Sequence, residues 1–238
     1  MALLSLRRRV PALLGVATLS TTALLVSTAG PAAAAPVEGT VHSNSYAEFG
    51  NDCDITNGAE SQTTAYRSGQ GERTAYAHGE FLGEMDDGSH VRGALGESET
   101  TTTAVATARN RAFKKVEVEV SHVVVLTNDS ALDCGMEVHA LSESDGMLRV
   151  RQPGRIRIKW SGTGGDVSSI ALRAPSGRML ISRDPSTVNG TATVNVRTGL
   201  FTWSSQLRTS LSESAVPLDD STILLNTFKV EVTYLPPA

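Results

Sequence analysis

Apolar and polar residues alternate with a period of two along most of this sequence. In VEVEV (116–120) every second residue is valine, and in RIRIKW (155–160) every second residue is apolar. The same alternation recurs in TATVNV (191–196) and FKVEV (228–232). Strict alternation puts one set of side chains on a buried face and the other in water, as in half-buried antiparallel strands. Residues 36–238 contain no convincing 3.6-residue apolar repeat, so the sequence predicts an all-β protein.

Turn signals separate the alternating runs and support an antiparallel β-sandwich. Asn57-Gly58, Asp145-Gly146 and Asn189-Gly190 are strong turn dipeptides. The segment Ala174–Gly177 joins two apolar runs, and its proline and glycine suit a tight turn, which predicts a hairpin there. The TAY repeats that contain Tyr66 and Tyr76 are expected to be two arms of another hairpin.

Residues 1–35 have the pattern of a secretory signal peptide. Three arginines (residues 7–9) precede an apolar run from Val10 to Val26, and four alanines (residues 32–35) precede Pro36. A basic start, an apolar stretch and a small-residue cleavage site are typical of exported proteins. We therefore expect a secreted, extracellular protein that begins near Pro36, with no membrane anchor in the mature chain. The excess of arginine over lysine, 17 to 4, is typical of a GC-rich bacterial source.

The chain contains two cysteines, Cys53 and Cys134. In a secreted protein such a pair predicts one disulfide bond. The alternative is two unrelated buried thiols. Neither cysteine has histidines at the spacing that a structural zinc site requires.

Charge is unevenly distributed between the two halves of the mature chain. Residues 36–145 hold 19 acids and 7 bases, whereas residues 146–238 hold 6 acids and 11 bases. The change falls at Asp145-Gly146, and each half has the size of a small β-sandwich. This favours two sandwich-like units, an acidic β-domain (36–145) with the disulfide and a basic β-sandwich domain (146–238). A single continuous sandwich is the alternative.

A group of basic residues with odd numbers is the main candidate for ligand binding. In an unbroken strand these side chains would share one face and could bind an acidic polymer. The alternative is a solvated strand face, or a face that docks on the acidic half. The residues are Arg149, Arg151, Arg155, Arg157 and Lys159.

Other chemistries have weaker support. The five histidines are scattered, and His122 has the parity of the valines around it, which predicts a place in or beside the core. The acidic loop around Asp52 and Asp54 does not match an EF-hand, so neither a metal nor a cofactor is predicted. No GxSxG nucleophile motif is present. By parity Trp160 and Trp203 are expected in the core, which leaves Tyr66 and Tyr76 as candidate surface aromatics.

These observations favour a secreted, non-enzymatic binding or interaction protein. The expected partner is an anionic surface polymer or another extracellular protein, and no nucleic-acid binding is expected. The alternative is a secreted hydrolase whose site is assembled from dispersed residues. A cleft with convergent carboxylates or a Ser-His pair would favour the enzyme, and a charged face without such groups would favour the binding protein.

Overall fold

A computed structural model of the chain describes residues 35–50, 53–55, 58–85, 92–129, 134–163, 167–183 and 189–237. The predicted signal peptide lies outside these residues, apart from Ala35. Nearly all described residues belong to strands. The helical structure among them is one short 3₁₀ turn, η1 (Glu213–Ala215). The prediction of an all-β chain is therefore confirmed.

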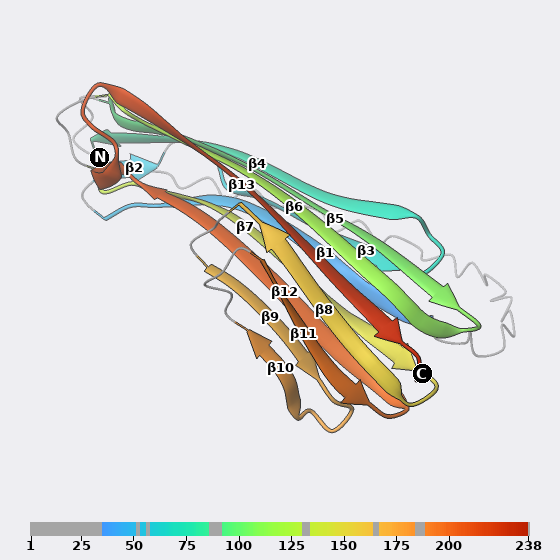
Figure 1. The fold of residues 1–238 in the computed structure, drawn as a ribbon. Coiled ribbons are helices and arrows are strands. Elements are labelled where there is room, and N and C mark those ends of the chain that lie inside the picture. The colour runs from blue at the N-terminus through green and yellow to red at the C-terminus, as the bar shows by residue number, and fades with distance from the viewer. Residues whose placement is uncertain are drawn as a thin grey trace, which may run out of the picture. The chain divides into compact units, whose positions relative to one another are not determined.

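The strands form two antiparallel sheets that pack face to face as a β-sandwich (Figure 1). Sheet A has six strands, in the spatial order β10 (Met179–Arg183), β9 (Val167–Arg173), β12 (Gly199–Ser212), β7 (Glu137–Val150), β1 (Val37–Glu48) and β3 (Glu60–Arg67). Sheet B has seven, in the order β11 (Asn189–Val196), β8 (Gly154–Gly162), β13 (Asp220–Leu235), β6 (Ala112–Asn128), β5 (Arg92–Arg109), β4 (Glu72–Met85) and β2 (Cys53–Ile55).

The period-two pattern has the predicted consequence in strand after strand. In β6, Val116 and Val118 are buried between the sheets, whereas Glu117 faces outward and pairs with Lys115 and with Lys229 of β13. The predicted hairpin at Ala174–Gly177 is also present. It joins β9 to β10, with the Gly177 N–H donating to the Ala174 carbonyl at 2.8 Å.

The sandwich is one unit, which differs from the two-unit organisation that the charge distribution favoured. Asp145 and Gly146 lie inside β7 rather than between domains. Strand β7 pairs with β1 on one side and with β12 on the other, so both halves of the sequence share one sheet. Ala34–Ala238 accordingly form a single compact unit. A change in net charge along the sequence did not mark a boundary, because the strands of the two halves pair with each other.

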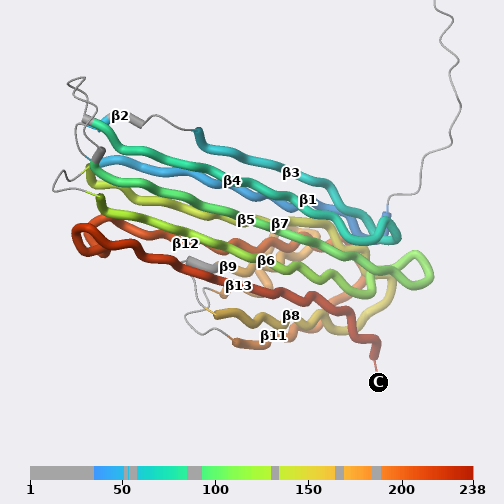
Figure 2. The backbone as a smooth tube through the Cα atoms, turned by 90° about the horizontal axis from the view of Figure 1, so that it is seen from above, coloured from blue at the N-terminus to red at the C-terminus, as the bar shows by residue number. Residues whose placement is uncertain are grey.

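The two ends of the sandwich differ. At one end, which we call the turn end, short connections join successive strands: residues 68–71, 110–111, 151–153, 174–178 and 197–198. The C-terminal end of β13 lies there too, beside the β5–β6 hairpin (Figures 1 and 2). At the opposite end β6 leads into β7, and β12 leads into β13 through η1.

The interior is not continuously apolar. One apolar cluster near the turn end includes Val41, Val118 and Leu148, and a second near the opposite end includes Phe81, Leu126 and Met136. Between them lies a row of buried polar side chains that we call the polar belt: Ser43, Ser45, Ser98, Thr100, Thr102, His122, Ser142, Ser144, Ser205 and Thr209. Hydroxyl-to-hydroxyl and hydroxyl-to-imidazole contacts satisfy many of these groups, as burial of polar groups requires.

Candidate functional site

The five basic residues singled out in the sequence do not form one stripe. Arg149 lies in β7 of sheet A, whereas Arg155, Arg157 and Lys159 lie in β8 of sheet B. The chain crosses between the sheets at the turn that contains Arg151. Arg149 and the β8 residues therefore occupy opposite outer faces of the sandwich. The alternative in which this face docks on a separate acidic domain does not hold for the described residues, because both halves of the sequence share one sandwich there.

Basic residues instead gather at the turn end. Within four positions of its five turns, and at the adjoining ends of β1 and β13, the described chain has 13 basic residues and two acidic ones, Glu38 and Glu72. The basic residues are Arg67, Arg73, Arg109, Arg111, Lys114, Lys115, Arg149, Arg151, Arg155, Arg157, Arg173, Arg178 and Arg197. In the fold, therefore, charge differs between the two ends of the strands rather than between two domains, because basic residues from both halves of the sequence lie at the turn end.

A cleft at the turn end brings three of these cations together. Arg109, Lys114 and Arg151 line it, and the buried side chains of Phe113 and Val150 lie at its base. Its volume is about 360 Å³. The Arg151 Nε atom donates to the Arg111 carbonyl oxygen at 2.8 Å, which ties the β7–β8 turn to the β5–β6 hairpin. Among the described residues no carboxylate lines this cleft, so all the charged side chains that line it are cationic.

The hairpin beside the cleft has an unusual backbone. Asn110 and Arg111 form the two-residue turn between β5 and β6, with φ of 52° and 57°. Positive φ at both positions is the geometry of a type I′ turn, in which the second position is ordinarily glycine. An arginine in this region carries a steric cost of about 1 kcal/mol. Strained backbone beside a cleft is a common property of functional sites.

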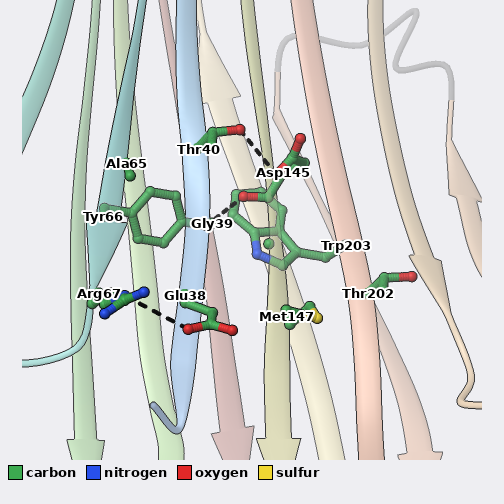
Figure 3. Close-up of a pocket in the computed structure, with 11 residues that line it drawn as sticks. Glu38, Gly39, Thr40, Ala65, Tyr66, Arg67, Asp145, Met147, Thr202 and Trp203 are labelled. Atoms are coloured by element: carbon green, nitrogen blue, oxygen red, sulfur yellow. Dashed lines mark hydrogen bonds and ion pairs between the residues drawn. The ribbon is translucent and has the colours of Figure 1, made fainter. Parts of the chain in front are cut away.

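A shallow groove of about 410 Å³ lies on the outer face of sheet A, near the same end (Figure 3). Arg67 pairs with Glu38 at 3.6 Å on one side of it, and Thr40 donates to the Asp145 carboxylate at 3.1 Å on the other. The polar groups at its rim are therefore already paired with each other. The groove contains no set of convergent charges that would suit catalysis.

The groove exists because two glycines lie side by side beneath it. Gly39 of β1 and Gly146 of β7 are register partners, flanked by Tyr66 of β3 and Trp203 of β12. The two aromatic side chains point inward and cover the glycine backbone, and the Tyr66 hydroxyl donates to the Asp145 carbonyl at 2.8 Å. Burial raises the pKa of the Tyr66 hydroxyl above its ordinary value. Tyr66 is therefore a core residue.

The aromatic predictions have mixed outcomes. Trp160 and Trp203 are buried as predicted, with 7% and 2% of their surfaces exposed. Tyr76 is 45% exposed and is a surface aromatic, but the prediction for Tyr66 is wrong. The expected hairpin is also wrong, because β3 belongs to sheet A and β4 to sheet B. Side chains of β3 instead form hydrogen bonds with backbone groups at the edge of β4. For example, Gln62 Oε1 accepts from the Tyr76 N–H at 2.6 Å.

A Ser-His pair is present, but it is not in a cleft. The Ser142 Oγ lies 2.7 Å from His122 Nε2, and the Thr209 Oγ1 lies 3.0 Å from His122 Nδ1. His122, Ser142 and Thr209 are all within the polar belt and at most 1% exposed. The third partner of the imidazole is a hydroxyl rather than a carboxylate. Because substrate could not reach this hydroxyl, the pair is structural. The prediction that His122 lies in or beside the core is confirmed.

The predicted disulfide is confirmed. Cys53 and Cys134 are bonded, with their Cα atoms 5.5 Å apart. The bond joins β2, at the edge of sheet B, to the segment that precedes β7 of sheet A. Glu213 of η1 strengthens the same region, because its buried carboxylate accepts from the Cys134 and Met136 N–H groups at 3.4 and 2.9 Å. No pattern in the sequence indicates this role for Glu213.

The described residues hold neither a candidate metal site nor a membrane-spanning helix. They contain no group of three or more His, Cys, Asp or Glu side chains placed to hold a metal ion. The candidate loop around Asp52 and Asp54 lies mostly outside the described residues. Within the described part of the chain, no helix is long and apolar enough to cross a membrane.

Comparison with known proteins gives no family. No protein-family model and no curated protein sequence matches the chain. Among solved structures, the secreted serine protease VesC from Vibrio cholerae aligns with 9% identity and a TM-score of 0.26, over 85% of this chain and 48% of VesC. The GH31 alpha-xylosidase from Xanthomonas citri aligns with 6% identity and a TM-score of 0.21, over 79% of this chain and 32% of the xylosidase. This chain thus spans less than half the length of either protein, and the similarity carries no functional argument.

Proposed function

We propose that this protein is a secreted, non-enzymatic binding protein whose turn end binds an anionic polymer outside the cell. The observation that carries the proposal is the ratio of 13 basic to two acidic residues around the turns. The mature chain predicted from the sequence has 18 basic and 25 acidic residues, or a net charge of −7. Positive potential confined to one end of an otherwise acidic protein orients that end toward an anionic ligand.

The chemistry of the turn end suits phosphate or carboxylate groups that repeat along a polymer. Eleven of its 13 basic residues are arginines, whose planar guanidinium groups bind such anions through two parallel hydrogen bonds. The cleft between Arg109, Lys114 and Arg151 could hold one repeat unit of the polymer. The arginines of neighbouring turns would contact the units on either side.

The enzymatic alternative has less support. The hydrolase hypothesis required a cleft with convergent carboxylates or a Ser-His pair. The Ser142–His122 pair lies in the interior, and the cleft at the turn end has basic residues and no described carboxylate. A basic cleft of this kind suits binding of an anion, whereas general acid–base hydrolysis needs a group that can exchange protons there.

Export to the cell exterior is part of this proposal. A disulfide bond is compatible with an oxidising compartment. Strand β1 begins at Val37, and the Pro36 carbonyl accepts from the Arg149 N–H at 2.9 Å. Cleavage before Pro36 would therefore remove the leader and keep the first residue that bonds to the sandwich. Mass spectrometry of the protein from culture medium tests this, and an intact residue 1 on the secreted protein would refute it.

Binding can be tested with immobilised linear polyphosphate and polygalacturonate as probes. We expect the mature protein to be retained on at least one of them at low salt and released as salt rises, because exposed charges are screened beyond about 8 Å at ~0.15 M salt. The double variant Arg109→Ser/Arg151→Ser should elute at clearly lower salt. Both side chains line the cleft, so the loss should exceed that of two cations elsewhere.

The matched control is Lys159→Ser/Arg183→Ser, which removes the same charge from exposed positions away from the cleft. It should elute close to the wild type. Equal losses in the two double variants would show that net charge, rather than the turn end, governs retention. No retention of the wild type on either polymer would overturn the proposed function.

A further inference from the structure

The cleft at the turn end is apolar as well as basic. Five of the ten described residues that line it are apolar or aromatic, although it lies among exposed cations. They are Ala112, Phe113, Val150, Tyr234 and Pro236. Its volume of about 360 Å³ lies within the range of small-molecule sites, about 300–1,000 Å³, which combine an apolar lining with a few polar groups. Attraction of anions by charge alone does not require such a lining.

Tyr234 of β13 supplies the aromatic part of the lining. Alternation along β13 gives Tyr234 the inward-facing parity of Val230 and Val232, which are both buried. Because the sandwich ends here, the apolar core covers the Tyr234 ring only partly, and the ring lines the cleft. An inward-facing aromatic side chain is thus within reach of a ligand that approaches the turn end.

The hydroxyl of Tyr234 fixes the orientation of the ring. It donates to the β7–β8 turn, where its oxygen lies 3.0 Å from the Gln152 carbonyl oxygen and 3.1 Å from that of Pro153. Gly154 leaves room for the ring, because a Cβ there would lie 2.8 Å from the Cε2 atom of Tyr234. A side chain that is already held in one orientation loses little conformational entropy on binding. The ring is therefore a preformed apolar surface beside the cations.

Polar groups of two kinds surround this surface. Arg109, Lys114 and Arg151 are exposed cations, which match the charge of a carboxylate. Asn110 and Gln152 also line the cleft, and a side-chain amide can both donate to and accept from a hydroxyl group. The lining thus suits a ligand with an apolar face, hydroxyl groups and a carboxylate. A sugar acid carries all three on one ring.

We propose that the polymer bound at the turn end is an acidic polysaccharide, and that one of its sugar-acid rings occupies the cleft. The inference rests on the proposed function and names its ligand class. The C–H face of the sugar ring packs against Tyr234, and the carboxylate of the sugar pairs with the three cations. An inorganic polyphosphate has charge but no C–H face, so it would leave the aromatic ring without an apolar partner.

The test compares elution of the mature, disulfide-bonded protein from columns of polygalacturonate and linear polyphosphate, matched in their content of anionic groups. Polyphosphate has the denser charge along its chain, so binding through charge alone would resist more salt on that column. We expect the reverse order, because salt screens ion pairs but not the contact with the Tyr234 ring. Elution from polyphosphate at equal or higher salt would overturn this inference and leave the proposed function intact. Retention on neither column would overturn the proposed function itself.

The variant Tyr234→Leu keeps an apolar side chain and removes the aromatic face. Its affinity for a polygalacturonate oligomer should fall about threefold to tenfold, the effect expected for loss of a contact with an aromatic face. Its retention on polyphosphate should not change. The matched control is Tyr76→Leu, which makes the same change at a tyrosine that is 45% exposed and lies outside the turn end. This control should bind both polymers like the wild type.

A second variant separates the ring of Tyr234 from its hydroxyl. Tyr234→Phe keeps the aromatic face and loses the bond to the β7–β8 turn, so its affinity for the oligomer should fall less than that of Tyr234→Leu. Unchanged affinity of Tyr234→Leu for the oligomer would overturn the inference, and so would equal losses on the two polymers. Where Tyr234→Leu does not fold, the order of elution of the wild type decides the matter.

Discussion

The Nε2 atom of His122 and the hydroxyl oxygen of Ser142 lie 2.7 Å apart at the centre of the sandwich, where they connect its two layers. His122 comes from β6 of sheet B and Ser142 from β7 of sheet A. The second nitrogen of the same imidazole contacts Thr209 of β12, again in sheet A. A neutral imidazole can donate at one nitrogen and accept at the other, so it satisfies both hydroxyls.

Protonation of His122 should therefore destabilise the protein in acid. Burial lowers the pKa of this imidazole from 6.5 to about 4. Between these values the unfolded state binds a proton that the folded state does not, so stability falls as the pH drops from 6.5 toward 4. The loss should approach about 3 kcal/mol. Urea unfolding at pH 7 and pH 4 should show a smaller difference in His122→Gln. Equal differences in the two proteins would contradict this role for His122.

Replacing Gly39 with alanine should destabilise the fold. A Cβ at this position would collide with the Asp145 carbonyl and lie 2.6 Å from the Tyr66 hydroxyl oxygen. Overpacking of this kind costs about 1–3 kcal/mol. Gly58→Ala is the control, because a Cβ there meets no atom within 4 Å. Thermal unfolding should show a lower midpoint for Gly39→Ala and little change for Gly58→Ala. A Gly39→Ala protein as stable as the wild type would mean that the packing around Gly39 and Gly146 is loose enough to accept a methyl group.

Loss of the Cys53–Cys134 bond should lower stability without changing the fold. The two residues are 81 positions apart, and removal of a native disulfide typically costs about 2–5 kcal/mol. We expect Cys53→Ala/Cys134→Ala to unfold at lower denaturant concentration, with an unchanged far-UV circular dichroism spectrum. Reduction of the wild type should produce a similar shift. A double variant with wild-type stability would show that η1 and Glu213 hold this region alone.

Arg111→Gly should separate binding from stability. Glycine adopts the positive φ of this turn without steric cost, so the variant should be as stable as the wild type or more stable by up to about 1 kcal/mol. It also removes a cation from the turn end, so retention on the anionic polymer should fall. A control, Arg183→Gly, removes the same charge outside the turn end and should keep its retention. Reduced stability of Arg111→Gly would instead assign Arg111 a structural role.

Much of the fold could be predicted because alternation is a local property. The inward positions of Val116, Ile156 and Trp203 follow from parity alone, and each is buried. The pairing of Cys53 with Cys134 could be predicted because no third cysteine competes for either. The parity of apolar residues does not determine which strands are neighbours in a sheet. The predicted domain boundary at Asp145-Gly146 was wrong for this reason.

The turn end could not be found for the same reason. Arg67, Arg111 and Arg178 are far apart in the sequence and meet only because their turns lie at one end of the sandwich. The sequence instead drew attention to clustered arginines, of which Arg149 and Arg155 lie in different sheets. The burial of Tyr66 depends on Gly39 and Gly146, which come from two other strands. No local pattern around Tyr66 indicates that these two glycines leave space for its side chain.

The polar belt has a consequence for how the strands find their alignment. A slip of two residues between long strands keeps every apolar side chain facing inward, so alternation alone does not oppose it. In β5 and β6, such a slip would move Thr100 away from its register partner His122. Buried hydroxyls and the imidazole would then face alanine and valine side chains and lose their hydrogen bonds, at a cost of about 1–3 kcal/mol for each orphaned group. The polar belt therefore favours one strand register among several that would bury the apolar side chains equally well.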